Sequence, residues 1–398
     1  MSEWKKVKLG DVSTIFSGFA FKSKDMNNIA GIPLIKIKNI NNFTVSTVCD
    51  SYLNANVELG KYERFKLRPN DFLIAMTGQG SVGRVGKMMD YSPIFYVNQR
   101  VAIVRPNAEK VNPYYLFKCL ATNEREKELF NKANGAGQPN ISPAQIGDLD
   151  LIIPNLPIQH RIAIILSRYD SLIENYQKQI KLLEEAAQRL YKEWFVDLHF
   201  PGHENTKIVD GVPEGWEKKK LVDFANVIMG QSPKSEFYNN ENKGLPFHQG
   251  VGSYGNRFVV DDTYSTSYTR IAEPYSILFS VRAPVGRLNI TKNKIVIGRG
   301  LSAMTHIQGY QSFLFYLLKE RFFKDNIIGN GAIFASITKD ELLNLEFLIP
   351  TDDLIRRFNS LAKNMDDEIM NADGQICLLT EARDRMLPKL MSGNMVLK

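Results

Sequence analysis

A glycine-rich stretch is the first place in this sequence where residue types and spacing suggest chemistry. Residues 80–87 read GSVGRVGK and superficially resemble a phosphate-binding P-loop. The first and last glycines are one residue too far apart, however, and Met88 stands where a Ser or Thr would reach magnesium. We interpret the stretch as a turn after a strand that presents Arg84 and Lys87 to a phosphate or a base edge. A plain hairpin turn is the alternative.

Two further motifs could indicate catalysis or metal binding. Residues Asn112–Tyr115 are similar to the Asn-Pro-Pro-aromatic loop with which amino-methyltransferases hold a flipped base. The second proline is missing and no glycine-rich cofactor loop follows a strand, so a helix start is the better interpretation. His199 and His203 are separated by Pro201-Gly202 rather than placed on one helix face. The sequence predicts no metal site, no cofactor bound by this chain and no catalytic residue.

Several loops carry amide and guanidinium side chains beside tight turns. Asn and Gln suit adenine, and Arg suits guanine, in the major groove of DNA. Each such residue taken alone is also a common turn or capping residue, and that alternative stays open. The predicted DNA-binding residues are Lys36, Lys38, Gln79, Ser81, Arg84, Lys87, Asn98, Gln99, Arg100, Gln138 and Asn140 in the first half, and Gln249, Ser253, Tyr254, Asn256, Arg257, Arg282, Arg287 and Arg299 in the second.

Composition places the chain among ordinary globular proteins. Of its 398 residues, 44% are hydrophobic and 23% are charged, and the length suits two or three domains. No apolar run approaches the roughly 20 residues of a membrane span, and neither end resembles a signal peptide. The three cysteines are far apart, which favours a reducing compartment. We therefore expect a cytoplasmic protein with no membrane partner.

Two long helices must organise these loops. Between residues 157 and 195 apolar residues follow one another at steps of four and three, which is the pattern of a coiled-coil seam. A second helix near the C-terminus repeats the pattern with one charged exception, Arg383. A solitary helix would leave such a stripe in water, so we expect the two helices to pack as an antiparallel coiled coil. The predicted seam residues are Ile162, Leu166, Tyr169, Ile173, Tyr176, Ile180 and Leu183 in the first helix and Ile369, Ile376 and Leu379 in the second.

The two halves of the chain are repeats of each other. A shift of 196 positions (349 minus 153) superimposes Ile349-Pro350 on Ile153-Pro154 and continues without a gap through both helices. The start of each half matches at a shift of 212 (216 minus 4), where Trp216 corresponds to Trp4. The difference between the two shifts places insertions and deletions inside the lobes, where loops diverge on a shared scaffold.

Each half reads as a mixed lobe followed by a helix. Apolar runs rich in β-branched residues predict strands at 32–40, 71–77 and 97–105, and again at 276–281, 295–297 and 301–306. Helices are predicted from Asn112 and from Gln311. The expected fold is α+β, with a first lobe at 1–155, a first long helix at 156–199, a second lobe at 200–350 and a second long helix at 351–393.

Charge follows this division. Residues 1–154 carry 20 Lys and Arg against 14 Asp and Glu, and residues 201–350 carry 17 against 15. The helical stretches hold 6 against 6 (155–200) and 7 against 8 (351–398). The surplus of the overall net charge of +7 therefore lies in the lobes. This fits lobes that contact a polyanion and helices that do not.

The order of lobe, helix, diverged lobe and helix resembles the specificity subunit of type I restriction-modification systems along the whole chain. The resemblance is carried by Leu9-Gly10-Asp11 with residues 17–22 (SGFAFK), residues 32–40 (IPLIKIKNI), Ile152-Ile153-Pro154 leading to Gln159, residues 189–195 (RLYKEWF) and residues 387–393 (LPKLMSG). The order and duplication of these pieces, rather than any single one, identify the family.

The resemblance implies that each lobe is a target-recognition domain reading one half of a split double-stranded DNA site. The paired helices would act as a spacer and bind two methyltransferase subunits, with restriction subunits joining them. S-adenosylmethionine, ATP and magnesium would be bound by the partners, which would methylate adenine. A helix of about 39 residues extends about 58 Å, enough to separate the lobes by one duplex turn of roughly 34 Å.

Two other functions compete with this one. The chain could be a stand-alone DNA methyltransferase or endonuclease with an unrecognised site, or a coiled-coil adaptor that binds only protein. Methylation by the pure chain with labelled S-adenosylmethionine would favour the enzyme. A steep fall of DNA affinity with salt would argue against the adaptor, because phosphate contacts release counterions.

Overall fold

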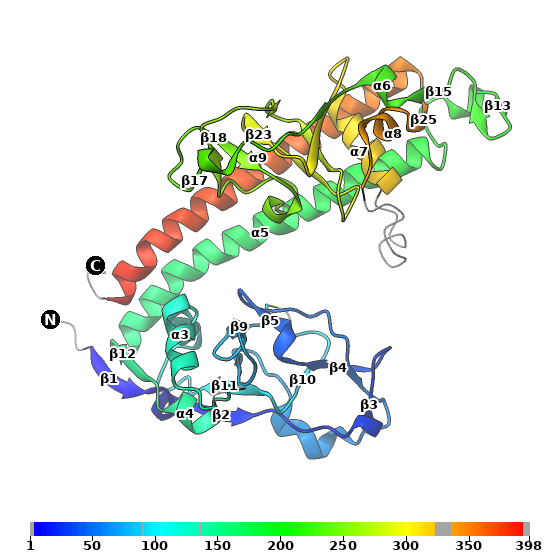
Figure 1. Cartoon of the computed structure of the whole chain (residues 1–398). Coiled ribbons are helices and arrows are strands. Elements are labelled where there is room, and N and C mark those ends of the chain that lie inside the picture. The colour runs from blue at the N-terminus through cyan, green and yellow to red at the C-terminus, as the bar shows by residue number, and fades with distance from the viewer. Residues whose placement is uncertain (1–3, 90, 136, 138, 323–335, 393–398) are drawn as a thin grey trace. The chain divides into compact units, whose positions relative to one another are not determined.

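The chain forms two compact units in the computed structural model, which describes residues 4–89, 91–135, 137, 139–322 and 336–392. Unit 1 consists of Met1–Glu174 and Cys377–Lys398, and unit 2 consists of Asn175–Ile376. Each unit holds one mixed lobe and a part of both long helices, α5 (Leu156–Phe195) and α9 (Asp352–Met391), as Figure 1 shows. The predicted α+β architecture of two tandem lobes, each followed by a long helix, is confirmed.

The lobe of unit 1 is built on two larger sheets. One sheet has the strand order β2 (Ser13–Ser17), β11 (Val101–Pro106), β8 (Phe72–Ala75), β9 (Val85–Lys87), β6 (Phe43–Val45) and β5 (Ile40–Asn41), and the other β10 (Tyr96–Val97), β4 (Ile32–Ile35), β7 (Tyr52–Leu53) and β3 (Met26–Asn27). Separately, β1 (Lys5–Lys8) pairs with β12 (Asp150–Ile153). The helices are α1 (Leu9–Val12), α2 (Pro113–Leu120), α3 (Asn123–Asn131) and α4 (Pro143–Gly147).

The lobe of unit 2 repeats this plan with different numbers of strands in its two larger sheets. One sheet has the strand order β16 (Ala225–Met229), β24 (Leu301–His306), β21 (Ile277–Ser280) and β22 (Leu288–Ile290). The other has the order β17 (Tyr238–Asn239), β19 (Tyr264–Ser265), β18 (Leu245–His248), β23 (Ile295–Ile297) and β20 (Ile271–Ala272). Two further pairs are β13 (Ile208–Val209) with β14 (Val212–Pro213) and β15 (Glu217–Lys220) with β25 (Glu346–Ile349). The helices are α6 (Leu221–Phe224), α7 (Gln311–Phe322) and α8 (Lys339–Leu343).

The central strands read as continuous apolar runs because both of their faces are buried. In β8, Phe72 and Ile74 pack into the core that also holds α2, while the alternating residues Leu73 and Ala75 pack into a second core on the other side of the sheet. Successive side chains of a strand point to opposite faces. In β21, Phe279 and Leu278 divide in the same way between two cores. The strands are therefore fixed on both sides, and the loops at their ends start from rigid positions.

Equivalent hydrogen bonds explain the two repeat shifts. The Leu9 backbone N–H donates to the Leu149 carbonyl, and the Leu221 N–H donates to the Leu345 carbonyl, both at 2.9 Å. Leu221 follows Leu9 by 212 positions, and Leu345 follows Leu149 by 196 (221 minus 9, 345 minus 149). The same scaffold bond thus joins the two differently shifted parts of each half, with all length changes between them.

Within unit 1 the first half of α5 packs against the last turns of α9. Ile162 and Leu166 of α5 share a buried core with Leu390 of α9. Arg383, the charged exception in the predicted seam, donates to the Asp170 carboxylate of α5 at 2.9 Å. The charge in the apolar stripe therefore has a partner on the facing helix.

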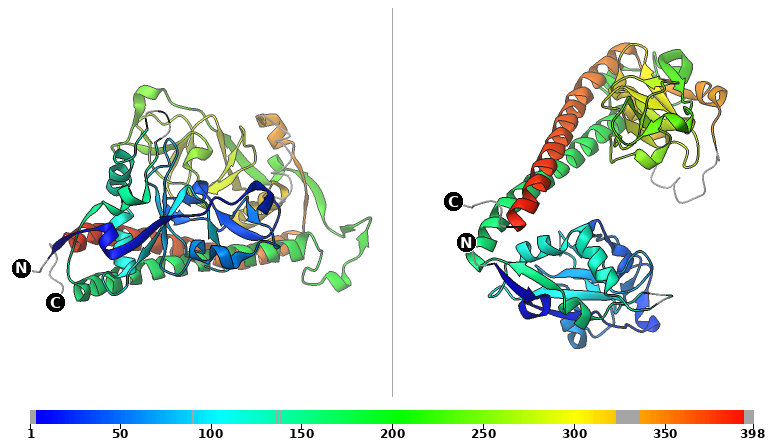
Figure 2. Two further views of the ribbon diagram at one scale, coloured as in Figure 1. Left: turned by 90° about the horizontal axis from the view of Figure 1, so that it is seen from below. Right: turned by 60° about the vertical axis from the view of Figure 1, so that its left-hand side comes forward.

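Within unit 2 the second half of α5 packs against the first half of α9 through aromatic rings. Phe358 of α9 is fully buried, and its ring lies 5.6 Å from Tyr191 and 5.2 Å from Phe195 of α5. Figure 2 shows the two helices side by side here. All ten predicted seam residues are buried or half-buried, with Ile162, Leu166, Ile173 and Ile369 buried.

Two predicted strands are shorter than expected. The run 32–40 is interrupted by a 3-10 turn at Ile37–Asn39, because the Asn39 side chain accepts the Lys36 backbone N–H at 2.9 Å. The run 97–105 is interrupted at residues 98–100, between β10 and β11. Both interruptions carry residues that we predicted to contact DNA.

We expect His306 to make the stability of unit 2 depend on pH. Its ring is buried, Nδ1 accepts the Gln308 backbone N–H at 3.1 Å, and burial lowers the pKa of His306 to about 4. The unfolded chain takes up the proton near pH 6.5. The contribution of His306 to stability is therefore present above about pH 6.5 and is lost as the pH falls toward 4, by about 2 kcal/mol between pH 7 and 5.

Urea unfolding at pH 7 and pH 5 tests this contribution. His306→Asn, which keeps an acceptor near the position of Nδ1, should show a smaller loss of stability between the two pH values than the unmodified chain. The exposed His160, changed to Gln, is the matched control and should behave like the unmodified chain. Equal losses in all three proteins would contradict the assignment.

Candidate nucleic-acid interface

Three loops of the first lobe meet beside the start of β11. The Met76 backbone N–H donates to the Arg100 carbonyl at 3.0 Å, and the Ile141 N–H donates to the Met76 carbonyl at 2.9 Å. Thr77 also forms a bridge with Asn140. The loops after β8, before β11 and before α4 are therefore neighbours. In the described part of these loops, four of the predicted DNA-binding residues are exposed, and we call them the first patch: Gln79, Gln99, Arg100 and Asn140.

The second lobe brings its own loops together with the same bonds. The Val281 N–H donates to the Gly300 carbonyl, and the Ile337 N–H donates to the Val281 carbonyl, both at 2.9 Å. The Gly300 N–H in turn donates to the Gln249 carbonyl at 3.1 Å. Three of the predicted DNA-binding residues are exposed at this corner in the described part of the chain, and we call them the second patch: Gln249, Arg282 and Arg299.

A glycine in each lobe permits this close packing. A Cβ atom on Gly18 would lie 2.2 Å from the Val97 carbonyl oxygen, and one on Gly230 would lie 2.1 Å from the Gly298 carbonyl oxygen. Both distances are shorter than any real contact. Gly230 follows Gly18 by 212 positions, so the repeat retains the one residue type that fits (230 minus 18). These glycines hold the end of β2 or β16 against the segment that carries each patch.

The loop after β8 is held in its conformation by hydrogen bonds within the lobe. Ser81 is half-buried and its hydroxyl donates to the Thr77 carbonyl at 3.3 Å. The Val85 N–H donates to the Glu126 carboxylate of α3 at 2.9 Å, which fastens the far end of the loop. Arg84 is half-buried and Gln79 is exposed. Ser81 is thus a turn residue, and Gln79 is the residue that the turn presents.

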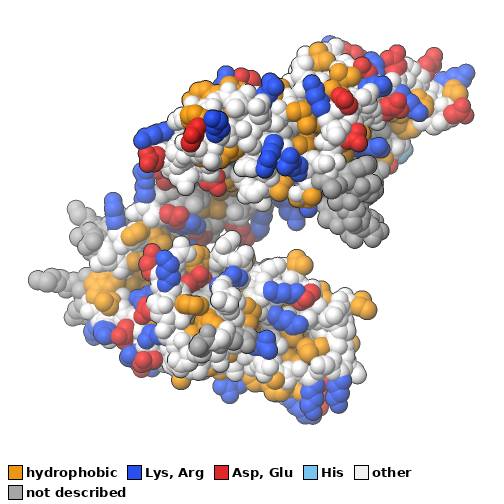
Figure 3. Space-filling model, in the orientation of Figure 1, with side chains coloured by type: hydrophobic (Ala, Val, Ile, Leu, Met, Phe, Trp, Pro, Cys, Tyr) orange, Lys and Arg blue, Asp and Glu red, His pale blue; other side chains and the backbone are white. Residues whose placement is uncertain are grey.

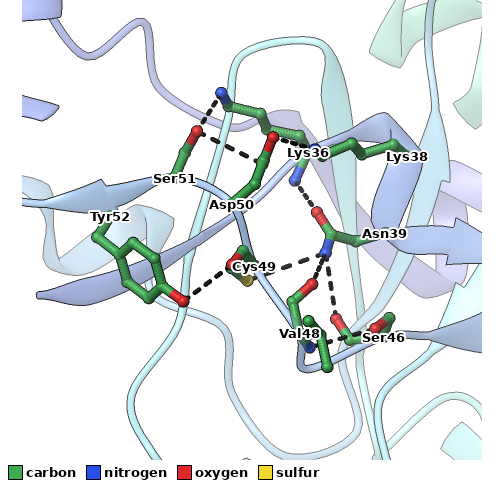
Figure 4. Close-up of polar contacts among 9 residues, drawn as sticks. All are labelled: Lys36, Lys38, Asn39, Ser46, Val48, Cys49, Asp50, Ser51 and Tyr52. Atoms are coloured by element: carbon green, nitrogen blue, oxygen red, sulfur yellow. Dashed lines mark hydrogen bonds and ion pairs between the residues drawn. The ribbon is translucent and has the colours of Figure 1, made fainter. Parts of the chain in front are cut away.

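A polar network organises the other candidate loop of the first lobe (Figure 4). Asn39 is buried, and its amide donates to the Val48 carbonyl at 2.9 Å and to the Ser46 carbonyl at 3.4 Å. The Tyr52 hydroxyl donates to the Cys49 carbonyl at 2.8 Å. The segment 46–52 is therefore fixed at both ends. At its tip, the Val48 side chain is 82% exposed.

Lys36 and Lys38 are engaged by this segment. Lys36 Nζ donates to Ser51 Oγ at 2.5 Å, and Lys38 forms an ion pair with Asp50. The hydrogen bond from Lys38 holds the pKa of the Asp50 carboxyl below its ordinary value. Lys38 would have to leave Asp50 to neutralise a phosphate. Both lysines stay candidates, but neither is free in this structure.

Lys87 lies apart from the first patch. Its side chain is half-buried and its Nζ lies 6.0 Å from the centre of the Tyr114 ring on α2. Burial, together with the nearby Lys118, lowers the pKa of Lys87. The structure therefore argues against the predicted role of Lys87 as a phosphate contact, because the ammonium group faces the interior of unit 1.

The polar loop of the second lobe is held by a buried histidine. His248 is fully buried, with Nδ1 2.7 Å from Ser253 Oγ and Nε2 2.9 Å from the Asp261 carboxylate. Ser253 thus holds the loop in place. Tyr254 packs beside Val259 with its hydroxyl buried, and burial raises the pKa of that hydroxyl. We therefore assign structural roles to Ser253 and Tyr254, which we had predicted to contact DNA.

The contact of Arg257 with DNA stays a prediction, and the structure gives this side chain partners inside unit 2. The side chain is 3% exposed, and its guanidinium forms ion pairs with Glu184 of α5, at 3.2 Å, and with Asp366 of α9. It also lies 4.3 Å from the centre of the Phe315 ring. Burial by itself would lower the pKa of the Arg257 guanidinium, but the neighbouring Tyr316, Asp366 and Glu184 raise this pKa above its ordinary value. Arg257 therefore connects the loop to both helices.

The remaining candidates divide by exposure. Asn256 is exposed beside Arg257, Arg287 is half-buried in the turn after β21, and Asn98 is half-buried with its side-chain oxygen accepting the Arg100 N–H at 3.2 Å. Gln138 lies outside the described residues. Figure 3 shows Lys and Arg side chains interspersed with acidic ones over the visible face, so charge alone does not outline the interface.

Sequence reasoning missed the residues that build these loops. Sequence patterns assign no role to the side chains of Asn39, His248 and Asp261, because their roles depend on burial and contacts that only the fold reveals. Among the described residues, no group of three His, Cys, Asp or Glu side chains could hold a metal ion. Over the same part of the chain, no helix has the length and apolar character needed to span a membrane.

The sequence matches the family model described as the type I restriction modification DNA specificity domain over residues 1–185 and 213–354. This chain belongs to that family. Specificity subunits of the family are non-catalytic and bind no cofactor themselves, and the enzymatic activity lies in their partner subunits. This specificity protein therefore has a DNA-recognition role.

Relatives match the specificity protein along its whole length. A Methanocaldococcus jannaschii protein assigned to the MjaX type I restriction enzyme as its specificity subunit is 28% identical over 405 residues, covering 100% of this chain and 94% of the relative. The MjaIX specificity subunit of the same organism is 26% identical, with coverages of 99% and 94%. The crystal structure of the S subunit from M. genitalium has a TM-score of 0.62 at 15% identity, with coverages of 98% and 96%, and shares the fold.

Proposed function

We propose that this specificity protein reads a split DNA site, with the first patch contacting one half-site and the second patch the other. The observation that carries the proposal is the pair of equivalent corners: the same backbone bonds gather exposed amide and guanidinium groups in both lobes. The side chains differ, with Gln79, Gln99, Arg100 and Asn140 in one lobe and Gln249, Arg282 and Arg299 in the other. Different base-edge donors and acceptors select different bases.

We further propose that α5 and α9 separate the two half-sites and bind two methyltransferase subunits, which restriction subunits join. Leu182 of α5 and Leu378 of α9 support the docking part of this proposal. They are 64% and 61% exposed, and the shift of 196 makes them equivalent (378 minus 182). Exposed leucines at equivalent positions suit two copies of one partner. S-adenosylmethionine, ATP and magnesium belong to those partners, with adenine as the methylated base.

Exchange of one lobe tests the function. Replacing residues 1–155 with those of a relative should change one half-site of the methylated sequence and leave the other half-site unchanged. The measurement is methylome sequencing of cells that carry the chimaera together with its methyltransferase subunit. The reciprocal exchange of residues 200–350 is the control and should change only the other half-site. An unchanged sequence, or a change in both halves from one exchange, would contradict the proposal.

A further inference from the structure

A charged carboxylate joins the first lobe to the helices. Asp170 of α5 accepts a hydrogen bond from the Tyr114 hydroxyl at 2.5 Å and pairs with Lys118 at 2.7 Å, both from α2 of the lobe. It also pairs with Arg383 of α9 at 2.9 Å. The Asp170 side chain is 22% exposed and that of Lys118 is 15% exposed. One carboxylate therefore connects three helices of unit 1.

The second lobe is joined to the helices in the same way. Asp366 of α9 accepts a hydrogen bond from the Tyr316 hydroxyl of α7 at 2.9 Å and forms an ion pair with Arg257 of the lobe. Arg257 continues to Glu184 of α5. The Asp366 side chain is 18% exposed. The Arg257–Asp366 pair thus links the lobe to α9, and Arg257 links it to α5 in unit 2.

Asp170 and Asp366 are equivalent in the repeat (366 minus 170 is 196). Each accepts from a tyrosine hydroxyl on the helix that follows the central sheet of its lobe, and each binds a cation from the same lobe. The cations, Lys118 and Arg257, come from unrelated places in the sequence. The acid and the tyrosine hydroxyl are therefore common to both halves although the cation differs.

The energetics of such pairs favour a positioning role. Charge pairs with little exposure lose hydration that their attraction scarcely repays, so they are weak evidence for stability, whereas their directional bonds can select one arrangement. Apolar side chains alone would let a helix of the lobe slide or rotate on α5 or α9. A short carboxylate side chain that is hydrogen-bonded to both the lobe and a long helix prevents such sliding and rotation.

We propose that Asp170 and Asp366 are duplicated anchor residues that fix the orientation of each lobe on the helices, and thereby restrict the spacing between half-sites that the protein accepts. The inference rests on the proposed function. One base pair of added spacer moves a half-site by about 3.4 Å and turns it by about 35°. An anchored lobe does not follow that movement, and a loosened lobe does.

Methylation of a spacer library tests the anchors. The full-length protein is co-expressed with its methyltransferase subunit and offered both half-sites separated by the native spacer or by one base pair more or less. We expect Asp170→Asn and Asp366→Asn each to raise methylation at the altered spacers, relative to the native spacer, by about tenfold, which is the scale of one charged hydrogen bond. The half-site sequences should stay the same. The ratio does not depend on how much protein folds.

Milder variants and a matched control complete the test. Tyr114→Phe and Tyr316→Phe remove only the hydroxyl and should shift the ratio in the same direction by a smaller factor. Asp367→Asn is the control, because Asp367 is exposed, adjoins Asp366 and forms an ion pair along α9 with Lys363. The anchor role would be contradicted if the ratio of methylation at altered spacers to methylation at the native spacer stayed unchanged in both tyrosine variants and both anchor variants. An equal change of this ratio in Asp367→Asn would contradict it as well. Wild-type methylation without any split site would instead overturn the proposed function.

Discussion

Replacing Arg257 with alanine is expected to destabilise unit 2 by about 3 kcal/mol. The guanidinium is 3% exposed and is the cationic partner of Glu184 and Asp366, whose side chains are only 28% and 18% exposed. Removal takes this cationic partner from two partly buried carboxylates and also removes the contact with the Phe315 ring. Leaving one sign of a buried pair uncompensated costs far more than the pair contributes. Urea unfolding of the full chain measures the change.

The exposed Arg282 provides the comparison for this result. Arg282→Ala should alter the free energy of unfolding by less than about 0.5 kcal/mol, as surface substitutions do, and should weaken DNA binding by the assembled complex. If Arg257→Ala were instead as stable as Arg282→Ala and lost DNA binding to the same extent, Arg257 would be a DNA contact and the buried ion pair would be unimportant.

Replacing Phe358 with alanine is expected to cost about 3–5 kcal/mol, the range for a buried aromatic residue. Phe358 is fully buried at the contact of α5 and α9. Its ring lies within 6.3 Å, between ring centres, of the rings of Tyr191, Trp194, Phe195, Phe313 and Tyr316. Truncation opens a cavity that rings packed edge to face cannot fill without moving. The midpoint of urea unfolding should fall accordingly.

Two variants limit the interpretation of the Phe358 result. Phe358→Leu keeps most of the apolar volume and should cost clearly less than alanine. Leu361→Ala removes a side chain that is 46% exposed on the same helix and should cost less than about 1 kcal/mol. If Leu361→Ala were as destabilising as Phe358→Ala, the helices would pack through another face.

Periodicity predicted the scaffold of this protein well. The bounds of α5 and α9 follow from a stripe of apolar residues, and the repeat shifts located equivalent scaffold bonds at Leu9 and Leu221. Arg383 looked like a defect in the stripe because sequence spacing shows only one helix at a time. Its partner, Asp170, is 213 positions away and could be paired with it only in the folded chain.

The candidate interface was harder to predict because the same residue types serve loops and ligands. Arg257 and Arg282 both follow glycine-bearing or strand-ending segments, yet one is buried between helices and the other is exposed. Lys38 has a carboxylate partner, Asp50, only because Asn39 folds the intervening segment back. Burial distinguishes these cases, and burial depends on contacts between residues far apart in the sequence.

The division of the chain has a consequence for its synthesis on the ribosome. Unit 2 is a continuous stretch, Asn175–Ile376, inserted into unit 1, whose last piece begins at Cys377. The first lobe leaves the ribosome early in translation. Unit 1 is completed only at the end of synthesis, when Leu390 packs against Ile162 and Arg383 pairs with Asp170. A nonsense mutation just after Ile376 would therefore leave unit 2 complete, although it is synthesised later, and would remove the last piece of unit 1, whose lobe is synthesised first.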